Sequence, residues 1–156
     1  MRKTRISTAA LESSSKSEKE WLDLEAASVV EVTSEDPNYP IEFALAARGP
    51  GWRAAVKGEQ IIRLVFDEPI SLRRIRLEFS EAETERTQEF TLRWARKGEP
   101  PKEIVRQQWN FSPHGSTREV EDYQVNLDSV SVLELMLKPD LQPDRALASL
   151  AAWRIS

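Results

Sequence analysis

From residue 28 onward, apolar and polar residues alternate along the chain with a period of two. Ile75, Leu77 and Phe79 fall on one side of an extended segment, and the residues between them are charged. Successive side chains of a β-strand point to opposite faces, so this alternation predicts half-buried strands. Eight such runs predict an all-β fold, an antiparallel jelly-roll β-sandwich. We expect its strands at 28–34, 60–66, 71–79, 87–96, 102–111, 117–127, 131–138 and 147–155.

The segments between these runs are rich in residues that interrupt a strand. Asp67-Glu68-Pro69, Lys97 to Pro101 and Pro139 to Asp144 each contain proline, which lacks the amide donor of a central strand, so each predicts a turn. Pro40 to Ala47 instead shows helical spacing and predicts a short helix that closes one end of the sandwich.

The first 20 residues differ from the rest because they are polar and serine-rich. Such a segment has too little apolar surface to order itself, so we expect a flexible tail at 1–20 and a single sandwich domain at 21–156. Ser17 and Glu20 match a helix capping box, whereas Trp21, Asp23 and Leu24 also fit a strand. The sequence leaves residues 17–25 open between helix and strand.

Residues 51–60 lead into the first central strand. Gly51 and Gly58 permit backbone conformations that other residues resist. Together with Val-Thr-Ser-Glu-Asp-Pro at 32–37, the sequences Trp-Arg-Ala-Ala at 52–55 and Gly-Glu at 58–59 resemble the galactose-binding-like, or discoidin-type, β-sandwiches. The local similarity is to the N-terminal domain of a eukaryotic scaffold of DNA single-strand-break repair. The order of the later strand motifs extends the resemblance over about residues 28–155.

This resemblance implies a ligand site on loops at one end of the sandwich. We expect the segments 34–39, 51–53 and 109–118 to converge there, and carbohydrate recognition combines an aromatic plate with polar side chains. Trp52 can equally be a core residue, and Arg53 can be a structural partner of its neighbours. The candidate residues are Trp52 or Tyr39 as the plate and Arg53, Asn110, His114 and Arg118 as polar contacts.

The residue inventory predicts a protein that is not an enzyme. His114 is the single histidine, and although Ser112 and Ser116 flank it, no orienting carboxylate accompanies them, so it fits a loop residue better than a catalytic base. The chain has no cysteine, which excludes thiolate metal sites. Glu35 and Asp36 could offer oxygens to calcium, but the Asp-Gly that precedes the tryptophan in many discoidin-type domains is missing, so we expect solvated turn carboxylates. We expect no metal and no cofactor.

Charge narrows the range of partners. The net charge is −4, which gives no overall attraction to phosphate backbones. A basic stripe for nucleic acid is conceivable, but neighbouring glutamates (Glu78, Glu89, Glu103 and Glu119) favour cross-strand ion pairs. The arginines of that stripe are Arg63, Arg73, Arg74, Arg76, Arg86, Arg93, Arg96 and Arg106.

Three function classes remain at this stage. A carbohydrate-binding module comes first, a scaffold for a protein partner in a DNA-repair context is the alternative, and an enzyme lacks a recognisable set of residues. Nucleic acid is an expected partner only through the scaffold role. The absence of cysteine and of a long apolar stretch predicts no membrane span and a cytoplasmic location.

Overall fold

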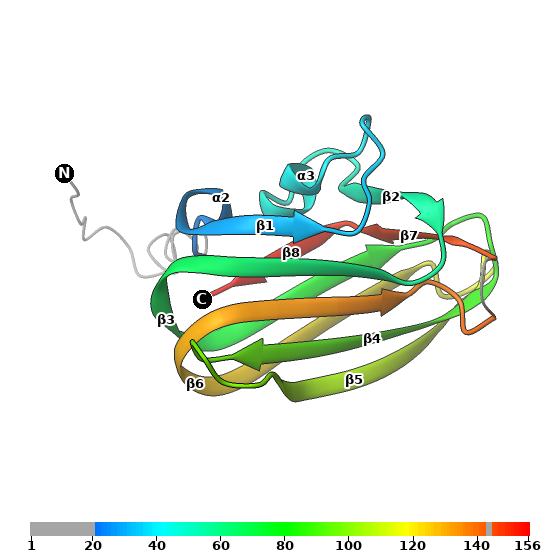
Figure 1. Ribbon diagram of the computed structural model, residues 1–156. Coiled ribbons are helices and arrows are strands. Elements are labelled where there is room, and N and C mark those ends of the chain that lie inside the picture. The colour runs from blue at the N-terminus through cyan, green and yellow to red at the C-terminus, as the bar shows by residue number, and fades with distance from the viewer. Residues whose placement is uncertain (1–20, 143–144) are drawn as a thin grey trace, which may run out of the picture.

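The structure, a computed structural model, describes residues 21–142 and 145–156. The expected flexible tail at 1–20, the capping pair Ser17 and Glu20, and the end of the turn predicted at 139–144 lie outside the described residues. The described chain forms the predicted all-β sandwich with two short helices (Figure 1). The elements are α2 Leu24–Ala27, β1 Ser28–Val32, α3 Ile41–Leu45, β2 Trp52–Lys57, β3 Gln60–Ser80, β4 Arg86–Ala95, β5 Lys102–Phe111, β6 Arg118–Lys138, β7 Leu147–Leu150 and β8 Ala152–Ile155.

Two long strands, β3 and β6, run through both layers of the sandwich. They pair antiparallel along most of their length, from Gln60 opposite Leu137 to Ser80 opposite Arg118. Figure 1 shows both strands curving back at the same end of the molecule, so that each contributes one half to each layer. The first layer contains β1, the first half of β3, the second half of β6, β4 and β5. The second layer contains β8, the second half of β3 and the first half of β6.

β3 and β6 bend at two places where the sequence predicted a strand to end. Strands were expected to end at residues 66 and 127, but β3 and β6 continue through both positions with shifts in register. Pro69 lies in the interval of β3 that has no β6 partner, between Val65 and Ile70, so its missing amide costs no hydrogen bond there. On β6, Ser129 has a positive φ of 57° at the bend. The turn signal at 67–69 was therefore correct about curvature and wrong about chain reversal, whereas the turn predicted at Lys97 to Pro101 does reverse the chain between β4 and β5.

A small second sheet, β2 with β7, was not predicted from the alternation. Trp52 pairs with Leu150 and Arg53 with Ser149. The strand expected over 147–155 is divided at Ala151, whose amide donates to the carbonyl of Glu78, and β8 then continues beside β3. Residues 52–57 show little alternation of apolar and charged residues, so the pattern gave no strand there.

Both helices are short. The helix expected at 40–47 is present as α3, Ile41–Leu45, and it buries Ile41, Ala44 and Leu45. The sequence left residues 17–25 open between helix and strand. The described part, 21–25, contains the start of the helix α2, where the Asp23 carboxylate accepts a hydrogen bond from the Ala26 amide.

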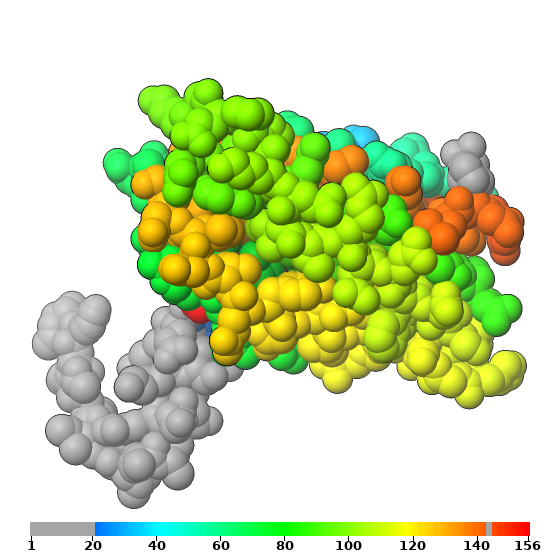
Figure 2. All heavy atoms as spheres, turned by 90° about the horizontal axis from the view of Figure 1, so that it is seen from below, coloured from blue at the N-terminus to red at the C-terminus, as the bar shows by residue number. Residues whose placement is uncertain are grey.

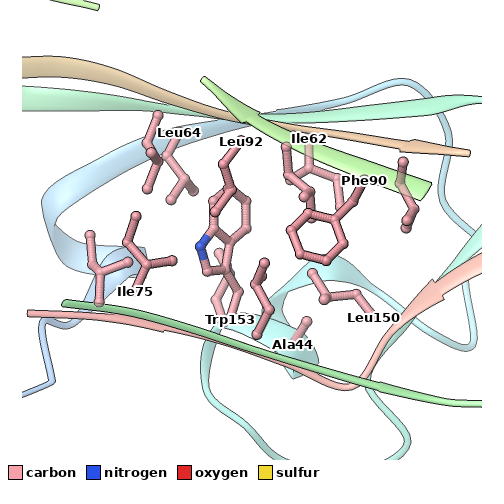
Figure 3. Close-up of a cluster of buried hydrophobic side chains, with 14 of the residues drawn as sticks. Ala44, Ile62, Leu64, Ile75, Phe90, Leu92, Leu150 and Trp153 are labelled. Atoms are coloured by element: carbon pink, nitrogen blue, oxygen red, sulfur yellow. The ribbon is translucent and has the colours of Figure 1, made fainter. Parts of the chain in front are cut away.

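The core lies between the two layers, where the inward side chains of the long strands meet. The predicted faces are confirmed, since Ile75, Leu77 and Phe79 are all 0% exposed. Figure 3 shows Trp153 among the buried aliphatic side chains of both layers. The rings of Phe79 and Phe90 stack across the layers, with centroids 5.4 Å apart. Burying side chains of this size contributes roughly 1.5–3 kcal/mol each, so this interface dominates the stability of the fold.

Candidate binding site

Trp52 is a core residue, which corrects the expectation of an exposed aromatic plate. Its side chain is 0% exposed, and its Nε1 donates a hydrogen bond to the carbonyl oxygen of Ser34 at 3.2 Å. The preceding Gly51 has a φ of 78°, and a Cβ there would lie 2.4 Å from the carbonyl oxygen of Leu150. Because glycine alone fits this approach, the chain turns inward and places Trp52 beneath the loop.

Tyr39 and Arg53 lie together, as the sequence predicted. The Cζ of Arg53 is 4.5 Å from the centroid of the Tyr39 ring, and the Arg53 amide donates to the Tyr39 carbonyl at 3.2 Å. Arg53 is exposed and Tyr39 is half-buried. Stacking covers one face of the ring, so this pair offers a guanidinium edge at the surface.

The three expected loop segments do not converge into one site. Residues 110–112 line a cleft, and among the described residues that line it none comes from 34–39 or 51–53. His114 is exposed in a turn closed by the hydrogen bond from the Ser112 amide to the Ser116 carbonyl. Arg118 forms an ion pair with Glu78. The structure therefore separates the predicted residues into a Tyr39–Arg53 pair, a turn that contains His114, and Asn110 at the end of β5.

Asn110 lines a cleft of about 400 Å³ at one end of the sandwich. Three connections meet there: β3 to β4, β5 to β6, and the segment that follows β6. Figure 2 shows this end on the right, where the orange segment after β6 lies beside the last residues of β5. The lining residues are Glu85, Arg86, Thr87, Asn110, Phe111, Ser112, Asp140, Gln142 and Arg145.

The rim of this cleft carries side chains that can both donate and accept hydrogen bonds. Asn110 accepts a hydrogen bond from the Thr87 hydroxyl at 2.7 Å. Arg145 donates to the amide oxygen of Gln142 at 2.7 Å and lies 3.7 Å from the Asp140 carboxylate. Asn110, Gln142 and Arg145 are exposed, so their remaining hydrogen-bonding groups face solvent.

Beneath the rim lies a buried guanidinium, that of Arg86. This side chain is 0% exposed, and its Nε donates to Glu81 at 2.8 Å. Its Nη1 donates to the Pro139 carbonyl at 2.6 Å, and its plane lies over the Phe111 ring at 4.8 Å. Nη2 has no hydrogen-bond partner among the described residues. Arg86 therefore ties the three connections together from below and fixes the shape of the cleft.

A buried carboxyl group continues this polar cluster toward the centre. Glu119 is 0% exposed and accepts a hydrogen bond from Gln88 at 3.1 Å. Burial, together with a hydrogen bond to Glu121 and the charge of that residue, raises the pKa of Glu119 to about 9. Glu119 is therefore protonated at neutral pH, which corrects the expectation that it pairs with a surface arginine. Burial and the same two glutamates also raise the pKa of Tyr123 above its ordinary value.

Sequence reasoning missed most of the cleft, although one signal was available. Phe90 and Leu92 face the core, and counting back by twos along the strand places Gln88 and Arg86 on the same inward face. An arginine at an inward position of a strand indicates a built polar cluster. Arg86 had been grouped with the solvent-facing arginines, which the structure shows to be wrong.

The other grouped arginines are mostly paired, as expected. On the outer face of the first layer, Glu134 lies between Arg63 and Arg93 and accepts hydrogen bonds from both. Arg106 pairs with Glu103 and Glu89. Burial of Glu134 opposes ionisation, but the hydrogen bonds from Arg93 and Arg63 outweigh it and hold the pKa of Glu134 below its usual range.

The carboxylates considered for calcium serve the local backbone. Glu35 accepts a hydrogen bond from the Ile41 amide at 2.7 Å, at the start of α3, and Asp36 accepts one from the Asn38 amide at 2.9 Å. Among residues 21–142 and 145–156, no three His, Cys, Asp or Glu side chains are placed to hold a metal ion. In the same described ranges, no helix is long and apolar enough to cross a bilayer.

Comparison with solved structures gives the fold. The chain superimposes on CBM32-3 from a family 31 glycoside hydrolase of Clostridium perfringens with a TM-score of 0.60 and 14% identity, covering 88% of this chain and 95% of that one. This chain has the galactose-binding-like, discoidin-type fold. The CBM32 of AlyQ, in complex with 4,5-unsaturated mannuronic acid, gives a TM-score of 0.60 at 14% identity, covering 82% of this chain and 93% of that one.

The repair-scaffold resemblance also has a structural counterpart. XRCC1, in a structure bound to the DNA pol beta catalytic domain, gives a TM-score of 0.58 at 12% identity, covering 83% of this chain and 94% of that one. No protein-family model matches the sequence, and the comparison with curated proteins gives no match. At these identities the solved structures define the architecture of this discoidin-type chain and leave its ligand to be argued from its own residues.

Proposed function

We propose that this protein is a non-catalytic carbohydrate-binding module whose ligand occupies the cleft around Asn110. The observation that carries the proposal is the cleft itself, which has a polar rim and lies at an end of the sandwich where three connections meet. The similarity in fold to carbohydrate-binding modules supports the same class of ligand. Ligands of many folds bind on loops that a rigid scaffold positions.

The chemistry of the rim suits a polyhydroxylated ligand. A sugar hydroxyl both donates and accepts hydrogen bonds, and Asn110 and Gln142 each provide a donor and an acceptor on one amide group. Arg145 adds a planar donor that can span two neighbouring hydroxyl groups. Phe111 is 1% exposed beneath Arg86, so recognition in this cleft depends on hydrogen bonds and the fixed shape of the rim.

The test is a glycan-array screen with two double variants. Asn110→Ala with Arg145→Ala removes the rim of the cleft, whereas Tyr39→Ala with Arg53→Ala removes the other predicted pair. We expect selective glycan binding by the wild type, loss of at least tenfold in affinity for the cleft variant, and no change for the Tyr39 and Arg53 variant. The opposite pattern would move the site to the Tyr39–Arg53 pair and contradict the cleft proposal.

A scaffold for a protein partner is the second candidate, because XRCC1 shares the fold and was solved bound to another protein. The surface also carries exposed apolar side chains on two different strands, Val29 at 59% and Val56 at 55%. This candidate gains support if the folded protein binds nothing on the glycan array and a pull-down recovers a partner that a Val29→Glu variant no longer retains. Recovery that is equal for wild type and variant would count against β1 as the binding surface.

A further inference from the structure

Two polar atoms of the cleft around Asn110 lack a hydrogen-bond partner, and they are of opposite kind. Nη2 of Arg86 is a donor and Oδ2 of Asp140 is an acceptor, and neither forms a hydrogen bond among the described residues. Both side chains line the cleft, although that of Arg86 is 0% exposed and that of Asp140 is 7% exposed. Buried polar groups are normally paired, so an unpaired donor and an unpaired acceptor at one cleft indicate a place for a ligand group.

The other polar atoms of these two side chains are already used by the fold. Nε of Arg86 donates to Glu81 at 2.8 Å, and Nη1 also donates hydrogen bonds. Oδ1 of Asp140 accepts from the Gln142 amide at 3.2 Å. Oδ2 lies 3.7 Å from Nε of Arg145, which gives an ion pair without a hydrogen bond. Nη2 of Arg86 and Oδ2 of Asp140 therefore remain for a ligand.

The backbone holds the two side chains next to each other. The carbonyl of Pro139, one residue before Asp140, accepts from Nη1 of Arg86 at 2.6 Å. The amide of Leu141, one residue after Asp140, donates to the Thr87 carbonyl at 2.9 Å. Asp140 is thus fixed against the start of β4 from both sides. Among the described side chains, Arg86 and Asp140 nevertheless form no ion pair with each other, so the donor and the acceptor do not satisfy one another.

A hydroxyl group is the simplest ligand group that satisfies this pair. Its oxygen accepts a hydrogen bond while its hydrogen donates one, and two hydrogen bonds through one oxygen span roughly 5 Å. A ligand carboxylate could accept from Arg86 but would meet the like charge of Asp140. A ligand ammonium could donate to Asp140 but would meet the like charge of Arg86. Like charges in contact disfavour binding, and an uncharged hydroxyl avoids both conflicts.

The charges around the cleft favour the same class of ligand. The charged residues that line it are two acids, Glu85 and Asp140, and two bases, Arg86 and Arg145. The charge of Arg86 is further offset by its ion pair with Glu81. The cleft therefore has no surplus of cations to attract an acidic sugar, and Arg145 beside Asp140 disfavours an amino sugar.

We propose that the cleft selects neutral saccharides and that one ligand hydroxyl bridges Nη2 of Arg86 and Oδ2 of Asp140. This inference rests on the proposed function, because it names the class of sugar that the same cleft takes. A site built to hydrogen-bond a hydroxyl rejects an analogue that lacks it, since the buried polar groups are then left unpaired. The bridge therefore also selects which hydroxyl of the sugar ring enters the cleft.

The experiment titrates the full chain with six monosaccharides and measures their affinities by NMR. The probes are glucose, glucuronate and glucosamine, and galactose, galacturonate and galactosamine. We expect at least one neutral sugar to bind at least about tenfold more tightly than its uronate and its amino sugar. One monodeoxy derivative of that neutral sugar should bind at least about tenfold more weakly than the parent sugar, because it lacks the bridging hydroxyl.

Asp140→Asn tests the discrimination by charge. This variant keeps the size of the side chain and removes its negative charge, so the ratio of neutral-sugar affinity to uronate affinity should fall at least about tenfold. Asp67→Asn makes the same change at an exposed position outside the residues that line the cleft, and it is the matched control. The ratio should change less than about twofold in Asp67→Asn. The double variant Asn110→Ala with Arg145→Ala is measured alongside to show that the sugars bind in the cleft.

Four results would overturn the inference. A uronate that binds as tightly as its neutral sugar, and depends on Asn110 and Arg145, would keep the proposed function and remove the hydroxyl bridge. An affinity ratio that Asp140→Asn leaves unchanged, or that Asp67→Asn lowers equally, would exclude Asp140 from the discrimination. Failure of all six sugars to bind a protein that binds an array glycan through the cleft would also exclude the bridge. Silence on the glycan array as well would contradict the proposed function and this inference together.

Discussion

The indole nitrogen of Trp52 donates a hydrogen bond to the carbonyl oxygen of Ser34, and it does so from inside the core. This contact joins the start of β2 to the segment after β1. The tryptophan that looks most like a sugar-binding plate in the sequence therefore holds the loops above it in place.

Truncation of Trp52 should test this structural role. Trp52→Ala is expected to lower the free energy of unfolding by about 3–5 kcal/mol, because it removes a large buried side chain and leaves a cavity. Trp52→Phe, which keeps most of the volume and loses the donor, should cost less. Urea denaturation measures both. A loss below about 1 kcal/mol for Trp52→Ala would contradict the core assignment.

Gly51 should be much less replaceable than Gly98. Both have a φ near 77°, but a Cβ at Gly51 would lie 2.4 Å from a backbone oxygen, whereas nothing lies within 4 Å of one at Gly98. Gly98→Ala carries only the conformational cost, on the order of 1 kcal/mol. Gly51→Ala adds the overlap and should lower the thermal midpoint clearly further. Equal midpoints for the two variants would show that the Gly51 loop can shift.

Glu119 should make the protein less stable as the pH rises toward 9. Its pKa in the folded state, about 9, lies above its unfolded value near 4.5, so the protonated form is the one that folding favours. That contribution is fully present below the unfolded pKa and is lost as pH rises through the folded pKa, with a slope of up to about 1.4 kcal/mol per pH unit. Urea unfolding at pH 6 to 9 measures it. Glu119→Gln should flatten the slope and stabilise the protein at pH 8, and parallel curves for wild type and variant would exclude this origin.

Glu134 should act in the opposite direction. Its folded pKa is depressed, so its contribution is present above the unfolded pKa and is lost as pH falls through the folded pKa. Glu134→Gln is expected to cost about 1–3 kcal/mol at pH 7, because Arg63 and Arg93 lose a shared charged acceptor, and to cost less as the pH falls through the folded pKa. Glu103→Gln, at an exposed ion pair, is the control and should change stability by less than about 1 kcal/mol.

The sequence was informative wherever burial follows alternation. Leu77, Leu92 and Leu135 were assigned to the core from their spacing, and all are 0% exposed. The bends of β3 and β6 were read as chain reversals, because Asp67-Glu68-Pro69 interrupts pairing in the same way whether a strand turns back or changes layer. Trp52 was ambiguous, since a tryptophan after a glycine fits both a rim and a core.

The candidate site was harder to predict because it joins residues far apart in the chain. Tyr39 and Arg53 lie together, as the convergence of 34–39 with 51–53 implied, whereas Asn110 was expected on an end loop and lies in β5, one residue before its end. Beyond residues 110–112, the cleft is lined by residues 85–87 and by Asp140, Gln142 and Arg145, and the inward position of Arg86 is the one local signal among them. Their proximity depends on the Arg86 contacts with Glu81 and Pro139, which no local spacing reveals.

The pairing of β3 with β6 also sets the order in which the fold can be completed during synthesis. These two strands pair with each other in both layers. Gln60, at the start of β3, pairs with Leu137, near the end of β6, so its partner is synthesised much later. Before residue 118 is synthesised, β1 is the one folded-state strand partner of β3 that has already been made, because β6 and β8 both come later in the sequence. We therefore expect the edges of β3 and β4 to stay open in the growing chain until residues 118–155 supply β6 and β8.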